Sequence, residues 1–150
     1  MSWVLGSEVE VNHIRRCGSF SVALAPSCHF SGCSKKSPLG QIGFSFEGQF
    51  HPARNAIDTL RQVFDLFIKR DPRFAERFAG LPKHGRTRRY LARDAGELYQ
   101  DRPDLGSVKL DSGWWMSTNH SRQTIGQIIS LACDVAHVIH GLDLTDNLGD

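Results

Sequence analysis

A short basic segment in the second half of the chain has the residue types that bind phosphate. It runs from Lys83 to Arg89 as Lys-His-Gly-Arg-Thr-Arg-Arg, with Arg93 close behind and no acidic residue between them. Guanidinium groups form paired hydrogen bonds with phosphate oxygens or guanine edges, and a glycine lets the backbone approach a partner closely. The segment therefore predicts a nucleic-acid-binding loop, although a solvated basic turn ahead of a strand would have the same composition. Its candidate contact residues are Arg86, Thr87, Arg88 and Arg89.

A second polar run begins at two adjacent tryptophans and extends from Trp114 to Arg122. We expect a strand to end and a helix to begin here, and a helix N-terminus offers free backbone N–H groups and a favourable dipole to an anion. An asparagine amide carries both a donor and an acceptor, so Asn119 has the groups that pair with the edge of adenine. Ordinary helix capping by Ser121, with Asn119 in a turn, is the competing interpretation. The candidate contact residues of this run are Thr118, Asn119, Ser121 and Arg122.

The first 33 residues hold residue types that bind zinc, but not at the usual spacing. Most structural zinc sites contain a Cys-x2-Cys pair, which is missing here. We therefore predict that this segment holds no metal and that its thiols are reduced and unpaired. Cys133 is predicted to be buried on the apolar face of the last helix. No signal peptide is recognised, so the predicted compartment is the reducing cytoplasm. The zinc-type residues are His13, Cys17, Cys28, His29 and Cys33.

Common catalytic motifs are missing from the sequence. We find no Walker A loop, no Gly-x-Ser-x-Gly elbow and no His-Glu-x-x-His, and Asp94 and Glu97 have no nearby lysine that would complete a nuclease-like metal site. We therefore expect neither an enzyme nor a bound cofactor. The formal net charge is +2, and no apolar run is long enough to cross a bilayer, so we expect no membrane partner.

The spacing of apolar residues predicts the helices that position both polar runs. Residues 1–40 lack a long periodic apolar face and predict an irregular N-terminal arm, followed by one domain over residues 41–150. Apolar residues at helical spacing between Ile57 and Phe67 predict an amphipathic helix. A short helix should begin at Asp71-Pro72, and the last helix should begin at Ser121 and end at Gly141.

Alternating apolar and polar residues predict short strands. Together with the helices they predict an α+β fold, in which a small three-stranded antiparallel sheet packs against amphipathic helices. Asp111-Ser112-Gly113 is typical of a hairpin loop between the last two strands. The predicted strands cover residues 42–46, 89–93, 107–110 and 114–118.

The second half of the chain resembles the C-terminal DNA-binding domain of the SeqA family, negative modulators of replication initiation. The resemblance covers roughly residues 52–139 and rests on short motifs around the two polar runs. These motifs are His84-Gly85-Arg86-Thr87-Arg88, then Tyr90-x-Ala92-x-Asp94 with Leu98, and finally Trp115-x-x-Thr118-Asn119.

The resemblance implies a non-catalytic module that docks in the major groove of double-stranded DNA and prefers hemimethylated GATC. Such a module would act in the regulation of replication, transcription or restriction. One DNA-contacting loop would hold Arg86, Thr87 and Arg88, and the other Thr118 and Asn119. The second loop is shorter here, with Ser121 or no residue where the family has a second asparagine. The family's N-terminal oligomerisation region has no counterpart in residues 1–40, which leaves the oligomeric state open.

We therefore expect two neighbouring turns that project from one side of the domain and together grip a duplex. The alternative is a protein-interaction or regulatory domain that keeps the fold without DNA readout. An exposed Trp114 in an apolar surface patch, with Arg86 and Arg88 held in internal ion pairs, would favour that alternative. A nuclease fragment is a third hypothesis, and the missing metal-carboxylate set argues against it.

Overall fold

The computed structural model describes residues 40–149, except for residues 83–87, 100–101 and 103–104. The predicted arm, residues 1–40, therefore lies outside the described residues apart from Gly40. The predicted α+β class is confirmed, with one difference: the chain forms two three-stranded antiparallel sheets rather than one.

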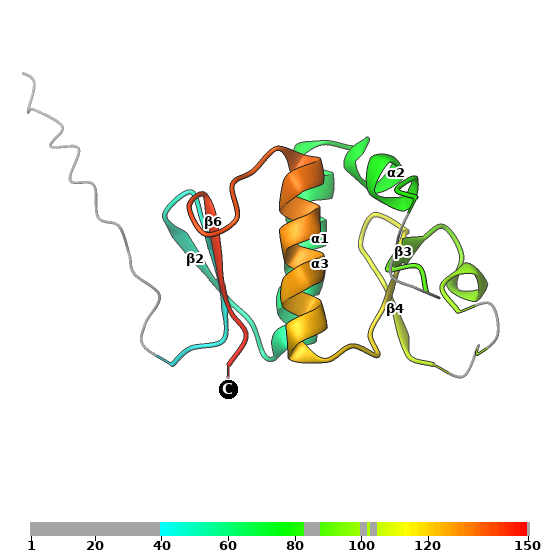
Figure 1. Cartoon of the computed structure of the whole chain (residues 1–150), viewed down its shortest axis with the longest axis horizontal. Helices are drawn as coiled ribbons and strands as arrows, with labels where there is room; N and C mark the ends of the chain where they lie inside the picture. The colour runs from blue at the N-terminus through cyan, green and yellow to red at the C-terminus, as the bar shows by residue number, and fades with distance from the viewer. Residues whose placement is uncertain (1–39, 83–87, 100–101, 103–104, 150) are drawn as a thin grey trace, which may run out of the picture. The chain divides into compact units, whose positions relative to one another are not determined.

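Two long helices occupy the middle of the domain, with one sheet on each side (Figure 1). These helices are α1, Ala56–Arg70, and α3, Arg122–Ala136. Their apolar faces share one core with Phe44 of the first sheet and Met116 of the second. Because one core contains side chains from both helices and both sheets, each sheet packs against the helix pair.

Helix α1 forms where the apolar spacing predicted it. Asn55 caps its N-terminus by accepting a hydrogen bond from the backbone N–H of Asp58. Phe64 is fully buried and packs against two phenylalanines of α2, Phe74–Ala79, with ring centroids 5.0 and 6.1 Å away. Burial of such large rings supplies much of the stability of a small domain.

The predicted start of α2 at Asp71-Pro72 is wrong by two residues. Asp71 instead ends α1, because its backbone N–H donates to the carbonyl of Phe67. Its carboxylate then accepts a hydrogen bond from the N–H of Arg73 at 2.9 Å, which forms a local turn before the helix.

Helix α3 begins at the predicted cap and ends earlier than predicted. The Ser121 hydroxyl accepts a hydrogen bond from Thr124 N. At the other end His137 adopts a left-handed conformation, with φ 57°, and the N–H of Val138 bonds the carbonyl of Cys133. The helix therefore stops at this turn, and Ile139, which the predicted helix would have included, is 59% exposed.

The first sheet has the strand order β2-β1-β6, and only its central strand was predicted. Strand β1, Gly43–Phe46, pairs with β2, Gln49–Pro52, and with β6, Leu144–Asn147. A two-residue turn joins β1 to β2, with Glu47 at φ 49° and Gly48 at φ 79°. Two positive φ angles are the geometry of a tight hairpin turn.

The second sheet has the order β3-β5-β4 and confirms the three strands predicted around the polar runs. One face packs on the helices, and the other carries a second, smaller apolar cluster formed by Ala92, Leu98 and Tyr99, with Leu105 and Trp115 at its border. Asp94 caps the 3-10 turn Ala95–Glu97 that covers this face. The strands are β3, Leu91–Ala92, β4, Ser107–Lys109, and β5, Trp115–Ser117.

None of the helices that the structure describes is both long and apolar enough to span a bilayer.

Candidate nucleic-acid interface

The two predicted contact runs meet at Arg88 and Asn119. The guanidinium Nη1 of Arg88 donates a hydrogen bond to the backbone carbonyl of Asn119 at 3.2 Å. Both residues are exposed. Arg86 and Thr87 lie outside the described residues, as do Lys83, His84 and Gly85. The structure therefore brings the described end of the basic segment against the amide-bearing loop.

The guanidinium group of Arg88 contacts a backbone carbonyl and an aromatic ring, both of which are neutral. Its guanidinium carbon lies 6.0 Å from the centroid of the Tyr99 ring, and its hydrogen bond goes to a carbonyl. The described part of the chain places no carboxylate within ion-pair distance of Arg88. A guanidinium has five N–H donors, so most of them stay available to a phosphate or a base edge.

The loop that carries Thr118 and Asn119 is held against Gly106. The N–H of Thr118 donates to the carbonyl of Gly106 at 3.0 Å. A Cβ at position 106 would lie only 2.7 Å from the hydroxyl of Thr118, so any larger residue there would force the Thr118 side chain or the backbone to move. The amide side chain of Asn119 makes no hydrogen bond within the described residues, and it is therefore free to face a ligand.

His120 lies directly beside these residues. Its Nε2 is 2.6 Å from the hydroxyl of Ser117, and its ring meets that of Tyr90 edge-on, with centroids 5.2 Å apart. Burial lowers the pKa of His120, and the nearby positive charge of Arg88 lowers it further. The ring is consequently held in its neutral form more strongly than in an unfolded chain.

The other described contact residues that we predicted are close to this pair in sequence. Arg89 lies 3.8 Å from Glu97, a long ion pair between half-exposed groups that is worth little. Ser121 is used as the cap of α3, as the competing interpretation proposed. Arg122, the first residue of α3, is exposed and forms no ion pair within the part of the chain that the structure describes.

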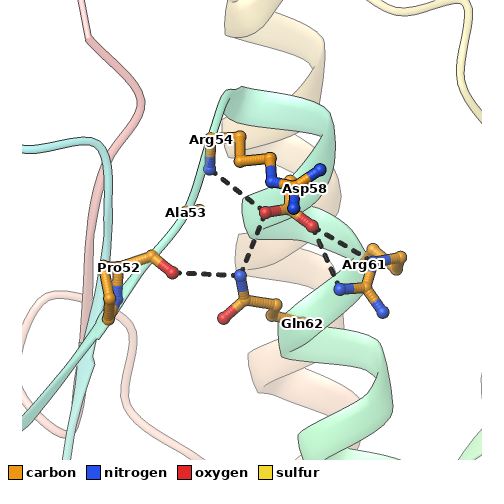
Figure 2. A pocket seen from close by; sticks show the side chains of 6 residues that line it. All are labelled: Pro52, Ala53, Arg54, Asp58, Arg61 and Gln62. Atoms are coloured by element: carbon orange, nitrogen blue, oxygen red, sulfur yellow. Dashed lines mark hydrogen bonds and ion pairs between the residues drawn. The ribbon is translucent and has the colours of Figure 1, made fainter.

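A polar hollow at the start of α1 is a structural network, as Figure 2 shows. Asp58 accepts hydrogen bonds from the N–H of Arg54, from the Arg61 side chain and from Gln62, each at 3.1 Å. Burial alone would raise the pKa of Asp58, but these hydrogen bonds outweigh it and leave the pKa below its ordinary value. The polar groups of the hollow are bonded to one another, so we assign it to helix capping.

Several predictions concern residues away from this interface. Cys133 is fully buried, as predicted, and burial raises the pKa of its thiol to about 12. Trp114 is only 7% exposed, with the Arg93 guanidinium 4.3 Å from its ring centroid, so the exposed Trp114 that would have favoured the protein-interaction alternative is not observed. Among the described residues, no three side chains of metal-binding type gather closely enough to hold an ion. The candidate zinc residues between His13 and Cys33 lie outside that part of the chain.

Three residues of the interface were not anticipated from the sequence: Tyr99, Gly106 and His120. Tyr99 and Gly106 lie in a segment with no motif, and they reach Thr118 and Asn119 only through tertiary packing. His120 lies inside the predicted polar run, so the sequence placed it near the interface. The sequence did not indicate that its ring would be partly buried.

No protein-family model matches the chain, and no curated protein is similar enough to match it. The resemblance to the SeqA family therefore rests on the motifs quoted above.

Proposed function

We propose that this chain is a non-catalytic module that binds double-stranded DNA through the paired loops around Arg88 and Asn119. The observation that carries the proposal is their direct contact. Among the described residues, the guanidinium has no carboxylate partner and the amide side chain beside it has no hydrogen bond. Phosphate contacts position a protein on DNA, and base-edge contacts give specificity. The two loops supply one group of each kind.

The candidate residues divide by chemistry. Arginines hold phosphate oxygens or guanine, threonine and serine hydroxyls contact the sugar-phosphate backbone, and the asparagine amide reads a base edge. The arginines are Arg86, Arg88, Arg89 and Arg122, the hydroxyl residues are Thr87, Thr118 and Ser121, and the amide is that of Asn119.

Sensitivity to adenine methylation belongs to the proposal through the resemblance to the SeqA family. The preferred site would then resemble hemimethylated GATC, and the module would act in the cytoplasm in the control of replication, transcription or restriction. Selection of bound sites from a random DNA pool, repeated with unmethylated, half-methylated and fully methylated probes, tests this part. Equal recovery of all three probe types would contradict methylation sensitivity.

Binding itself is tested by fluorescence anisotropy with a labelled duplex at several salt concentrations. If four to six phosphates are neutralised, log Kd should vary with log salt with a slope of magnitude about 4 to 5. Arg88→Ala should weaken binding to all duplexes and reduce that slope by about 1. Asn119→Ala should cost about 1–3 kcal/mol on the preferred site and much less on random DNA.

Arg73→Ala is the matched control. Arg73 is exposed and lies in the connection between α1 and α2, which Figure 1 places at the opposite end of the helix pair from the start of α3. Its removal takes away the same charge but should leave affinity within about twofold, because exposed charges at this distance are largely screened by salt. Binding that ignores salt, or that Arg88→Ala leaves intact, would refute the proposed function.

A further inference from the structure

Tyr99 contacts both loops of the candidate interface. Its ring lies beneath the guanidinium of Arg88, with 6.0 Å between the guanidinium carbon and the ring centroid. Its hydroxyl accepts a hydrogen bond from the backbone N–H of Asn119 at 3.4 Å and donates one to the carbonyl of Gly106 at 3.1 Å. One side chain therefore connects the basic segment, the amide loop and Gly106, the residue that precedes β4.

The position of this side chain is fixed at both ends. Tyr99 is 4% exposed and packs with Ala92 and Leu98 in the small cluster on the second sheet. A buried tyrosine ring of this kind has few rotamers, and its hydroxyl needs a partner. Since the hydroxyl has two partners on different segments, a change of the Tyr99 χ1 angle or movement of the loop would break a hydrogen bond.

Gly106 completes the connection. Its carbonyl accepts hydrogen bonds from both Tyr99 and the N–H of Thr118. Thr118 and Asn119 are consecutive, so their two backbone N–H groups are held by one carbonyl and one hydroxyl that are themselves bonded together. The geometry of the amide loop is thus set by the Tyr99 hydroxyl, and the Arg88 side chain is supported by the Tyr99 ring.

We propose that Tyr99 is the positioning residue that sets the distance between Arg88 and Asn119, so that discrimination between DNA sequences depends on its hydroxyl. This inference rests on the proposed function, in which Asn119 reads a base edge. A base contact needs a fixed hydrogen-bond geometry, whereas attraction of an arginine to phosphate tolerates movement. Loss of the hydroxyl should therefore reduce specific binding more than non-specific binding.

Tyr99→Phe is the decisive variant, because it removes the hydroxyl and keeps the ring in its cluster and beneath Arg88. We expect affinity for the selected duplex to fall about fivefold, the effect of one net hydrogen bond, with a smaller change on a random duplex. The salt slope should stay at the wild-type value, because no charge is removed. In an Asn119→Ala background the same substitution should have no further effect on specificity, because its effect acts through Asn119.

The results separate the inference from the proposed function. A wild-type protein that binds no duplex refutes both. A wild-type protein that binds, with Tyr99→Phe weakening selected and random duplexes equally, refutes the inference alone, because a simple loss of stability acts on both duplexes. An unchanged specificity ratio in Tyr99→Phe, or an undiminished effect in the Asn119→Ala background, refutes it in the same way. Faster hydrogen exchange at the Asn119 amide of unbound Tyr99→Phe is the accompanying result that supports it.

Discussion

The two sides of the helix pair differ in the groups that their positively charged side chains contact. On α1 and at the turn of the first sheet, arginines bond carboxylates. Arg61 lies 3.1 Å from both Asp58 and Asp65, and Arg70 lies 2.7 Å from Glu47. These pairs offset the charges of Arg61 and Arg70 locally.

Around the second sheet, some cations contact carboxylates and others contact neutral groups. Arg88 contacts a carbonyl and the Tyr99 ring, and Lys109 lies 5.8 Å from the centroid of Trp115. Arg93 does have a carboxylate partner there, Glu76 at 2.7 Å. Because a ring or a carbonyl orients a cation without cancelling its charge, Arg88 and Lys109 keep the positive charge that the proposed function requires for attracting a phosphate backbone. The difference teaches that the partners of an arginine are more informative about a binding surface than the number of arginines.

The largest expected effect is on stability, and it tests whether the main core and the small cluster on the second sheet are separate. Phe64→Ala should lower the free energy of unfolding by about 3–5 kcal/mol, because it opens a cavity in the main core. Leu98→Ala, in the small cluster that also contains Tyr99, should cost about 2–3 kcal/mol, since a cluster at the edge of the fold relaxes more easily. Urea unfolding measures both. Equal losses would show that the two clusters act as one core.

A smaller effect is expected at Gly106, where space and not charge is limiting. Gly106→Ala puts a methyl group against the Thr118 hydroxyl and should cost about 1–3 kcal/mol while shifting the NMR signal of the Asn119 amide. Gly126→Ala is the matched control, because a Cβ there would meet only Leu148 at an ordinary 3.8 Å. In the interior of α3 that change should stabilise the fold by about 0.5–1 kcal/mol. If both substitutions stabilised the protein, the close packing at Gly106 would be disproved.

The smallest effect is a pH dependence at His120. Its pKa in the folded protein lies below the ordinary value of 6.5, so between those two pKa values the unfolded chain binds more protons than the folded one. Stability contributed by the neutral ring is therefore complete above pH 6.5 and is lost as the pH falls through that value toward the folded pKa. The free energy of unfolding should decrease less between pH 7.5 and pH 5 in His120→Gln than in the wild type. An identical decrease in both proteins would exclude His120 as the source.

Elements with a strong local pattern could be predicted from the sequence. The apolar spacing of α1 and α3, the Ser121 cap and the hairpin loop between β4 and β5 are all local signals, and each is present in the structure. Strand β6 was missed because only Leu144 of its four residues is buried, which leaves no alternation to detect. The end of α3 was misplaced because the stripe continues in sequence to Ile139, whereas the left-handed turn at His137 redirects the chain.

The candidate interface shows the same limit. Arg88 and Asn119 were found from residue type, because a basic run and an amide beside a helix start have recognisable chemistry. Tyr99 and Gly106 contribute through a buried hydroxyl and a bare backbone, and neither property is visible until distant segments are packed together.

The short turn between β1 and β2 has a consequence for how freely this chain can change in length. Two residues join the strands, and the pairing of Phe46 with Gln49 leaves no slack in the connection. Because neighbouring strand residues face opposite sides, one residue added or removed within β1 or at this turn would tend to exchange the two faces of the strand and turn Phe44 and Phe46 outward. A change of length within β1 is therefore expected to disturb the main core, although the turn that follows the strand lies at the surface.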